Sequence, residues 1–247
     1  MSDIFEMPPR QALLRMVVPI SIGFVMLMVI DFADVAVAKY LSGDALAVMG
    51  YCYPVIYFMM AIGIGLNQGL TIVASADALK YGEARLYEWF IQSVYFAILM
   101  SIILILMSVA VLYFEWIDQE FMYLIADIKS FLGVILSAIC PMFILLILCA
   151  VSQIRGKPEA IRDVLGIMLL LTIALHPFCA LFLDLGVVGI AISKSLVTLL
   201  GVFFLLYRLI DLSIMKTVSW RFNWHKSVLL SRQALPASCI QLLVPVY

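Results

Sequence analysis

The chain has 247 residues, of which 66% are hydrophobic and 13% are charged, and its mean hydropathy is +1.15. Soluble domains contain about 45–50% apolar and about 25% charged residues, so this composition excludes a soluble globular protein and indicates one that crosses the bilayer several times. The net charge of −1 gives no reason to expect a nucleic-acid partner, and we expect the lipid bilayer to surround the chain.

Six apolar segments are long enough to cross a bilayer, whose hydrocarbon core of about 30 Å needs about 20 helical residues. We expect helices because lipid offers no hydrogen-bond partners to an open backbone. The segments are also too long for the strands of a membrane barrel. The predicted fold class is therefore an all-α polytopic membrane protein, with a six-helix lobe at residues 1–212. The six segments lie at 12–40, 45–76, 89–114, 121–152, 164–184 and 187–210.

Lysine and arginine gather at one end of these segments. If the N-terminus is cytoplasmic, the loops expected outside carry only Lys39 and Lys129. Cytoplasmic loops of membrane proteins carry an excess of basic residues, so we predict a cytoplasmic N-terminus in the cell (inner) membrane. The basic residues expected inside are Arg10, Arg15, Lys80, Arg85, Arg155, Lys157, Arg162, Arg208, Lys216, Arg221, Lys226 and Arg232.

The first segment carries two carboxylates, Asp31 and Asp34, in an otherwise apolar run. One uncompensated charge at mid-membrane costs about 3 kcal/mol on insertion scales. Spacing of three residues puts both acids on one side of a helix, so that side must meet water or an opposite charge. If the helix ends near Ser42, Asp34 lies about 12 Å below the outer edge, at 1.5 Å per residue.

Two further ionisable residues are expected at a similar depth. His176 precedes Asp184 by eight residues, and Lys194 follows the turn at 186–187 by about seven, which places them about 12 Å and about 10 Å deep. We predict that Asp34 pairs with Lys194 and that His176 lies close to one of them. A packing histidine beside Pro177, and a purely structural lysine that neutralises an acid, are the alternatives.

The segment AIGIGLNQGL (61–70) places Gly65 and Gly69 four residues apart, a pattern that lets two membrane helices approach closely. Asn67 and Gln68 make the same segment polar. They either hold neighbouring helices together or line a cavity. Prolines within four of the spans, at positions 19, 54, 141 and 177, predict kinks.

Residues 213–230 are basic, contain tryptophan and lack a long apolar run, which indicates a cytoplasmic linker. The pattern Arg-x-x-x-Pro-x-Ser at 15–21 then recurs at 232–238. Repeated halves are common in transporters, so we interpret 231–247 as the truncated start of a second lobe, a seventh helix. With few partners for such a helix, we expect the chain to be unsupported after Ser231.

Four stretches, in this order and spacing, resemble the N-terminal half of a multidrug and toxic compound extrusion (MATE) transporter: FADVAVAKYLSGDALAVMGYCYPV, AIGIGLNQGL, SQIRGKPEA and LDLGVVGIAIS. The resemblance implies twelve helices in two six-helix lobes. It also implies export of organic cations and drugs through a cleft between the lobes, coupled to inward flow of Na⁺ or H⁺.

Residue by residue, Asp34 matches the acid of the family's first helix, whereas Asp31 has no counterpart. Thr172, His176 and Lys194 occupy positions where the family has an Asn and an Asp on helix five and often a Thr on helix six. One carboxylate with an imidazole and an ammonium is a poor site for a hard cation that wants several oxygens. We therefore expect H⁺ rather than Na⁺ as the coupling ion, and no cofactor.

The leading hypothesis is a secondary transporter that exports small organic molecules, with a C-terminal half or a second copy of the chain as a partner. One alternative is a lipid-linked oligosaccharide flippase of the same superfamily, although its cavity would favour basic residues. Another is an inactive fragment that needs a second half. We find no catalytic or metal-binding motif such as H-E-x-x-H or G-x-S-x-G, so an intramembrane enzyme is not expected.

Overall fold

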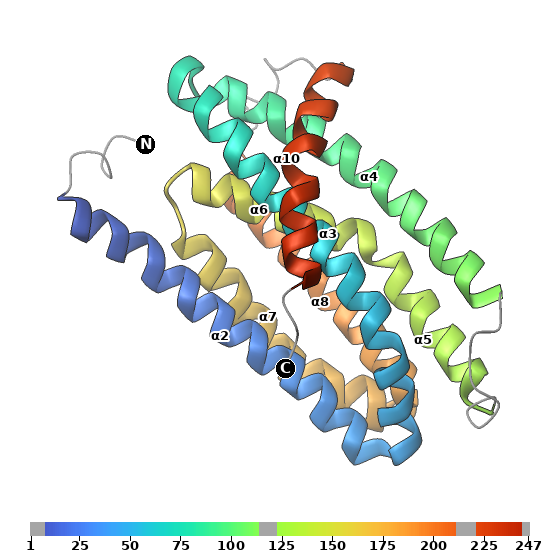
Figure 1. Ribbon diagram of the computed structural model, residues 1–247. Coiled ribbons are helices and arrows are strands. Elements are labelled where there is room, and N and C mark those ends of the chain that lie inside the picture. The colour runs from blue at the N-terminus through green and yellow to red at the C-terminus, as the bar shows by residue number, and fades with distance from the viewer. Residues whose placement is uncertain (1–7, 114–122, 211–220, 244–247) are drawn as a thin grey trace.

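The computed structural model describes residues 8–113, 123–210 and 221–243, and every element within these ranges is helical. Long helices form one elongated bundle, with α2 and α4 on opposite flanks (Figure 1). The elements are α2 (Pro9–Leu41), α3 (Gly43–Tyr81), α4 (Glu83–Tyr113), α5 (Ile125–Ser137), α6 (Ile139–Ile154), α7 (Glu159–Pro177), the π-helix η2 (Phe178–Phe182), α8 (Gly186–Leu209) and α10 (Trp224–Leu243).

The six predicted segments correspond to these helices. Five helices are long and apolar enough to cross a membrane, and α5 with α6 makes a sixth crossing if the bent pair is one span. The predicted all-α lobe of six membrane helices is therefore confirmed within the described residues. Its membrane-crossing helices reach a few residues beyond several of the predicted ends, because helical geometry continues past the apolar run until a cap or turn stops it.

Of the predicted proline kinks, one coincides with a bend between helices and a second with a change from α-helix to π-helix. The bend of 42° between α5 and α6 lies at Ala138, close to Pro141, which has no N–H to donate to the carbonyl of Ser137. Pro177 is followed by η2, where the Leu183 N–H bonds to the Phe178 carbonyl at 3.0 Å, a π-helical spacing. Pro19 and Pro54, by contrast, lie inside α2 and α3 without ending either helix.

The core lies on α6 and α8, while α2 is peripheral. Phe143, Ile147 and Leu148 of α6 and Leu205 of α8 are almost completely buried. Many large apolar side chains of α2 are instead exposed, as expected of a helix whose outer face meets lipid or another lobe. The helix α2 packs chiefly against α7 and α3.

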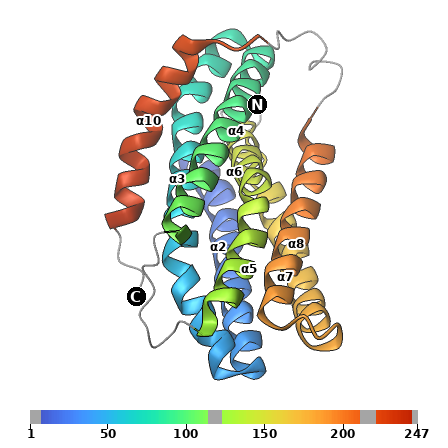
Figure 2. The ribbon, with the colours of Figure 1, turned by 90° about the vertical axis from the view of Figure 1, so that its right-hand side faces the viewer.

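The segment after Ser231 is packed, so the expectation of an unsupported segment is wrong for residues 231–243. The helix α10 runs beside α3 (Figure 2) and contributes buried Leu230, Ala234 and Ser238. A Cβ at Gly65 of α3 would lie 1.9 Å from Ser238 Oγ, and one at Gly69 would lie 2.9 Å from the Ala234 nitrogen. The glycine pair therefore supplies the close-approach surface for α10.

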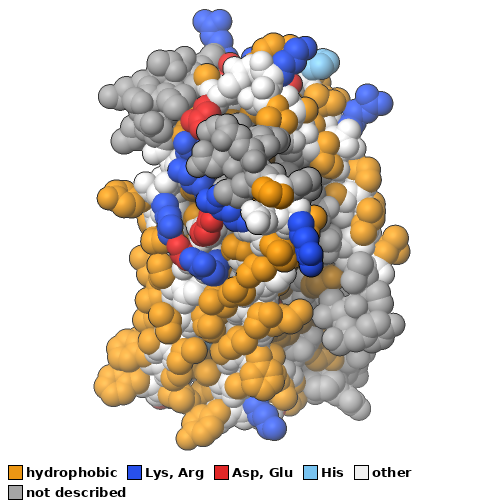
Figure 3. All heavy atoms as spheres, turned by 90° about the vertical axis from the view of Figure 1, so that its left-hand side faces the viewer, with side chains coloured by type: hydrophobic (Ala, Val, Ile, Leu, Met, Phe, Trp, Pro, Cys, Tyr) orange, Lys and Arg blue, Asp and Glu red, His pale blue; other side chains and the backbone are white. Residues whose placement is uncertain are grey.

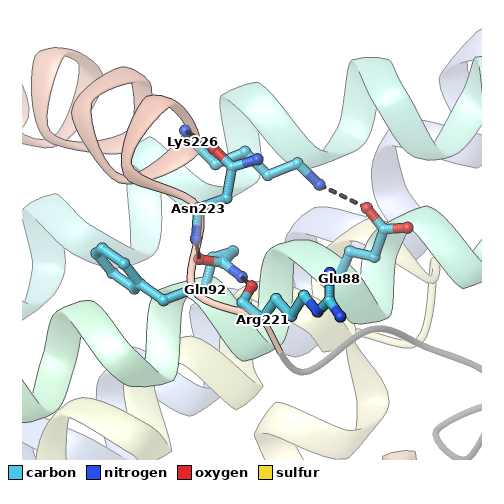
Figure 4. A pocket seen from close by; sticks show the side chains of 6 residues that line it. Glu88, Gln92, Arg221, Asn223 and Lys226 are labelled. Atoms are coloured by element: carbon cyan, nitrogen blue, oxygen red, sulfur yellow. Dashed lines mark hydrogen bonds and ion pairs between the residues drawn. The ribbon is translucent and has the colours of Figure 1, made fainter.

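The helix α10 also begins earlier than expected, at Trp224, inside residues 213–230 that were predicted to be a linker. Side chains of α4 hold the start of this helix (Figure 4). The Gln92 side chain donates to the Arg221 carbonyl at 2.7 Å and accepts from the Asn223 N–H at 2.8 Å. Lys226 Nζ lies 2.6 Å from Glu88 Oε2. These contacts line a cavity of about 370 Å³. Because they depend on polar side chains of another helix, the composition of the linker could not reveal them.

Charged side chains gather at the end of the bundle where α2 begins. On the face shown in Figure 3 they occupy the upper half, and the lower half is mostly hydrophobic with an isolated basic side chain at its foot. Ion pairs at this end join neighbouring helices, as between Arg15 of α2 and Glu159 of α7 at 3.8 Å and between Asp163 of α7 and Arg208 of α8 at 2.5 Å. This is the end that the basic residues predict to be cytoplasmic.

Candidate functional site

Asp34 lies at the centre of a polar cluster formed by three helices. Its carboxylate is 1% exposed and contacts two partners, with Oδ1 at 2.7 Å from His176 Nε2 of α7 and Oδ2 at 2.5 Å from Lys194 Nζ of α8. A buried carboxylate is tolerated only when it is paired and hydrogen-bonded, and here both oxygens are engaged. The structure therefore brings together the three residues expected at one depth.

Lys194 lies between two carboxylates. Besides Asp34, its Nζ is 3.4 Å from Oδ1 of Asp31, one helical turn earlier on α2. The two acids differ sharply in environment, since the side chain of Asp31 is 53% exposed and that of Lys194 is 29% exposed. The ammonium thus sits at the boundary between a buried acid and an exposed one.

Ser193 joins the cluster from the other side of the imidazole. Its Oγ is 2.9 Å from His176 Nδ1 and 3.0 Å from the Ile190 carbonyl oxygen. If the hydroxyl donates to Nδ1, a neutral imidazole carries its proton on Nε2 and donates it to Asp34. If the hydroxyl donates to Ile190, Nδ1 must carry a proton, and Nε2 can then face an ionised Asp34 only as imidazolium.

Close packing of α8 against η2 positions Ser193. A Cβ at Gly189 would lie 2.6 Å from the Cys179 carbonyl oxygen and 2.8 Å from the Ala180 nitrogen, so only glycine permits this approach. Ser193 follows Gly189 by one turn of α8, and His176 precedes Cys179 by about one turn. The contact therefore brings Ser193 and His176 to hydrogen-bond distance.

Tyr53 of α3 is a neighbour of the cluster that the sequence reasoning missed, as it also missed Ser193. The Tyr53 hydroxyl is buried, has no hydrogen-bond partner among the described residues, and lies within electrostatic range of Lys194, Asp34 and Asp31. Depth could have indicated Tyr53, because it lies eleven residues after Ser42, about 16 Å from the outer edge. Ser193 carries no such signal, since serines are common in membrane helices.

The remaining expected site residues do not take part in the contacts of Asp34, Lys194 and His176 described above. Thr172 is buried one turn before His176 on α7. Asn67 Nδ2 donates to the Leu146 carbonyl at 2.7 Å and so holds α3 against α6, while Gln68 is exposed. Asn67 therefore makes a contact between two helices. This agrees with the first of the two roles considered for residues 61–70, in which the polar side chains hold neighbouring helices together.

The net charge of the cluster depends on the protonation of His176. With His176 neutral, two carboxylates and one ammonium sum to a net charge of −1. One proton or one monovalent cation makes the cluster neutral, which is the state that a membrane interior favours. Within the described residues, no three His, Cys, Asp or Glu side chains converge as the ligands of a metal ion would.

Comparison with known proteins identifies a family and a fold. The MatE family model matches residues 19–178. A multidrug-resistance MATE transporter of the MOP superfamily in an outward-facing conformation superposes with a TM-score of 0.83 at 19% identity. A MOP superfamily transporter from Pyrococcus furiosus, whose binding pocket is described as reversed in polarity, superposes with 0.83 at 18%. A MATE structure in complex with MaD5 gives 0.84 at 17%.

These matches cover 97% of this chain but only 54%, 54% and 56% of the matched chains, so the chain spans about half the length of the solved structures that it resembles. At this level of identity the superposition shows the fold. A search of curated protein sequences found no match.

Proposed function

The chain belongs to the MatE family, and from that premise we propose that it forms one lobe of a secondary active transporter that exports drugs or organic cations in exchange for protons. The observation that carries the proposal is the buried Asp34 carboxylate, held by an ammonium and an imidazole from two other helices. Ionisable groups inside membrane segments commonly serve proton or ion pathways.

Protons suit this site better than Na⁺. Lys194 Nζ forms an ion pair with one carboxylate oxygen of Asp34 at 2.5 Å, and His176 Nε2 contacts the other. Na⁺ would have to displace a tethered cation and find several further oxygens, whereas a proton needs only one carboxylate oxygen. The departures of this chain from the family pattern at Thr172, His176 and Lys194 therefore favour H⁺ as the coupling ion.

Protonation of Asp34 would loosen α2. A protonated carboxyl no longer attracts the Lys194 ammonium, so the ion pair that joins α2 to α8 is lost. The helix α2 has little buried surface and contains Pro19, where one backbone hydrogen bond is missing. Pro19 is thus the point at which α2 would bend once the ion pair is lost, and alternating access requires an element that moves between two arrangements.

The test is transport by the chain together with a C-terminal lobe supplied as a separate polypeptide in proteoliposomes. Asp34→Asn should reduce proton-driven export at least about tenfold, because the proton site is lost. Lys194→Thr restores a hydroxyl that the family often has, and it should weaken the proton dependence or create a Na⁺ dependence. Lys39→Thr at the outer end of α2 is the matched control. Wild-type proton dependence in both site variants would overturn the proposal.

A lipid-linked oligosaccharide flippase is the second candidate. Its pyrophosphate substrate would need uncompensated basic residues in the cavity. The basic residue at mid-depth, Lys194, has carboxylates at 2.5 and 3.4 Å. The local charge therefore favours a cationic substrate over an anionic one.

A further inference from the structure

We propose that Lys194 is a switch whose ammonium passes from Asp34 to Asp31 when Asp34 takes up a proton, and that it thereby closes the exposed Asp31 carboxylate to cations. The inference rests on the proposed function in so far as that function places the proton on Asp34. It adds a role for Asp31, a residue that the family pattern does not contain.

The geometry requires only a small movement. Lys194 Nζ is 2.5 Å from Asp34 and already forms a longer ion pair with Asp31 at 3.4 Å, so a shift of less than about 1 Å shortens the contact with Asp31 to that of a close charge-assisted hydrogen bond. The two acids lie one turn apart on α2, so the four-carbon stem of lysine can serve both without movement of the backbone.

Charge balance sets the direction of the shift. While both acids are ionised, the ammonium is closest to the buried Asp34, where an unpaired charge is most costly. When Asp34 binds a proton it becomes neutral, and the ammonium keeps its own three protons. The groups facing it are then Asp31 from α2, Tyr53 from α3 and His176 from α7. Asp31 is the remaining anion of this set, so the ammonium moves to it.

Asp31 is the exposed carboxylate of the cluster. It lies ten residues before Leu41, about 15 Å from the end of α2, and its side chain is 53% exposed. An exposed carboxylate at that depth cannot face hydrocarbon at low cost, so it faces water, a partner lobe or a ligand.

The expected ligand is a monovalent cation. With Asp34 ionised, the ammonium is held 2.5 Å from Asp34 and only 3.4 Å from Asp31, so the Asp31 carboxylate keeps negative charge that attracts the ligand. With Asp34 protonated, Asp31 is closed by the ammonium. The cluster is neutral in both cases, since one proton replaces one cationic charge. The exchange therefore needs no protein group beyond Asp31, Asp34 and Lys194, and it predicts one proton per cation.

The experiment measures binding of tetraphenylphosphonium to the 247-residue protein in lipid nanodiscs by equilibrium dialysis at several pH values. Infrared spectroscopy of the same samples follows the carbonyl band of a protonated carboxyl group. In the wild type, the band should appear as the pH falls while cation affinity drops about tenfold over the same range. Asp31→Asn should abolish cation binding and keep the band.

The decisive comparison is between two variants that both lack the proton site. Asp34→Asn leaves Asp31 intact, yet it should bind the cation about tenfold more weakly, because the ammonium now rests on Asp31. The double variant Asp34→Asn with Lys194→Met should recover wild-type affinity and lose the pH dependence. It removes both partners, so no buried charge is left unpaired. Asp184→Asn, an exposed acid at the outer end, is the matched control.

Failure of rescue in the double variant would overturn the switch, because the cation would then depend on Asp34 itself. A wild-type protein that binds no tetraphenylphosphonium would also overturn it. The proposed function would still stand after either result, provided that the infrared band persists and that export remains proton-driven. Absence of the band with pH-independent export would instead show that the proposed function is wrong.

Discussion

Ser193 and His176 share one hydrogen bond that determines where the imidazole carries its proton. The distance from Ser193 Oγ to His176 Nδ1 is 2.9 Å, and the same hydroxyl lies 3.0 Å from the Ile190 carbonyl oxygen. One hydroxyl proton therefore serves two acceptors. Its choice decides whether Asp34 faces a neutral imidazole or an imidazolium.

Ser193→Ala should change the tautomer of His176. Without the hydroxyl, Nδ1 has lost its donor, so the balance between the Nδ1–H and Nε2–H forms shifts, and one buried hydrogen bond worth about 1 kcal/mol is lost. Nitrogen chemical shifts of ¹⁵N-labelled histidine report the tautomer directly. Ser195→Ala is the control, because the Ser195 hydroxyl bonds only to the Ala191 carbonyl of its own helix in the described structure. Identical spectra for wild type and Ser193→Ala would contradict the prediction.

Gly189→Ala should destabilise the protein and separate Ser193 from His176. The added methyl would meet the backbone of Cys179 and Ala180 at 2.6–2.8 Å, and backbone atoms cannot move aside as a side chain can. Overpacking of this kind costs about 1–3 kcal/mol. Thermal unfolding in detergent measures the loss.

Gly133→Ala is the matched helical control for Gly189→Ala, because nothing lies within 4 Å of a Cβ at Gly133. This substitution should leave stability unchanged or raise it by up to about 1 kcal/mol, since alanine favours a helix over glycine. Equal stability of the Gly189→Ala protein and the wild type would show that η2 and α8 have room to separate.

Gly65→Ala should release α10 from α3. The new Cβ would lie 1.9 Å from Ser238 Oγ and 2.7 Å from the Ala234 carbonyl oxygen, so the two helices must move apart. Hydrogen exchange followed by mass spectrometry should then show faster exchange over 224–243. Gly50→Ala, with nothing within 4 Å of its Cβ, should leave the exchange unchanged. Equal protection in both variants would mean that α10 is held mainly by Gln92 and Glu88 of α4.

A cell that expresses these 247 residues without a second lobe should remain as drug-sensitive as one that carries the empty vector. The resemblance implies a substrate cleft between two six-helix lobes, and the described residues form one such lobe with α10 beside it. Growth on increasing concentrations of a cationic dye measures the effect, and co-expression of a C-terminal lobe is the positive control. Strong resistance from the chain by itself would indicate that two copies assemble and supply both lobes.

The sequence by itself determined the membrane helices and the depth of the polar residues. Bilayer thickness sets how many apolar residues a span needs, so the six segments could be read from composition along the chain. A fixed rise per residue then placed Asp34, His176 and Lys194 at one level, and the cost of an unpaired charge in lipid implied that they meet. These rules apply to each helix separately and need no knowledge of its neighbours.

Only the tertiary structure decided how the two acids of α2 differ. Asp31 and Asp34 lie on the same side of the helix by spacing, yet the side chain of Asp31 is 53% exposed and that of Asp34 is 1% exposed. The difference arises because α2 is covered only along a narrow stripe, chiefly by α7 and α3, and because α8, which packs closely at Gly189 against η2, brings Lys194 to Asp34. The docking of α10 on Gly65 and Gly69 was likewise undetermined, because it depends on small residues of two helices that meet only when the chain is folded.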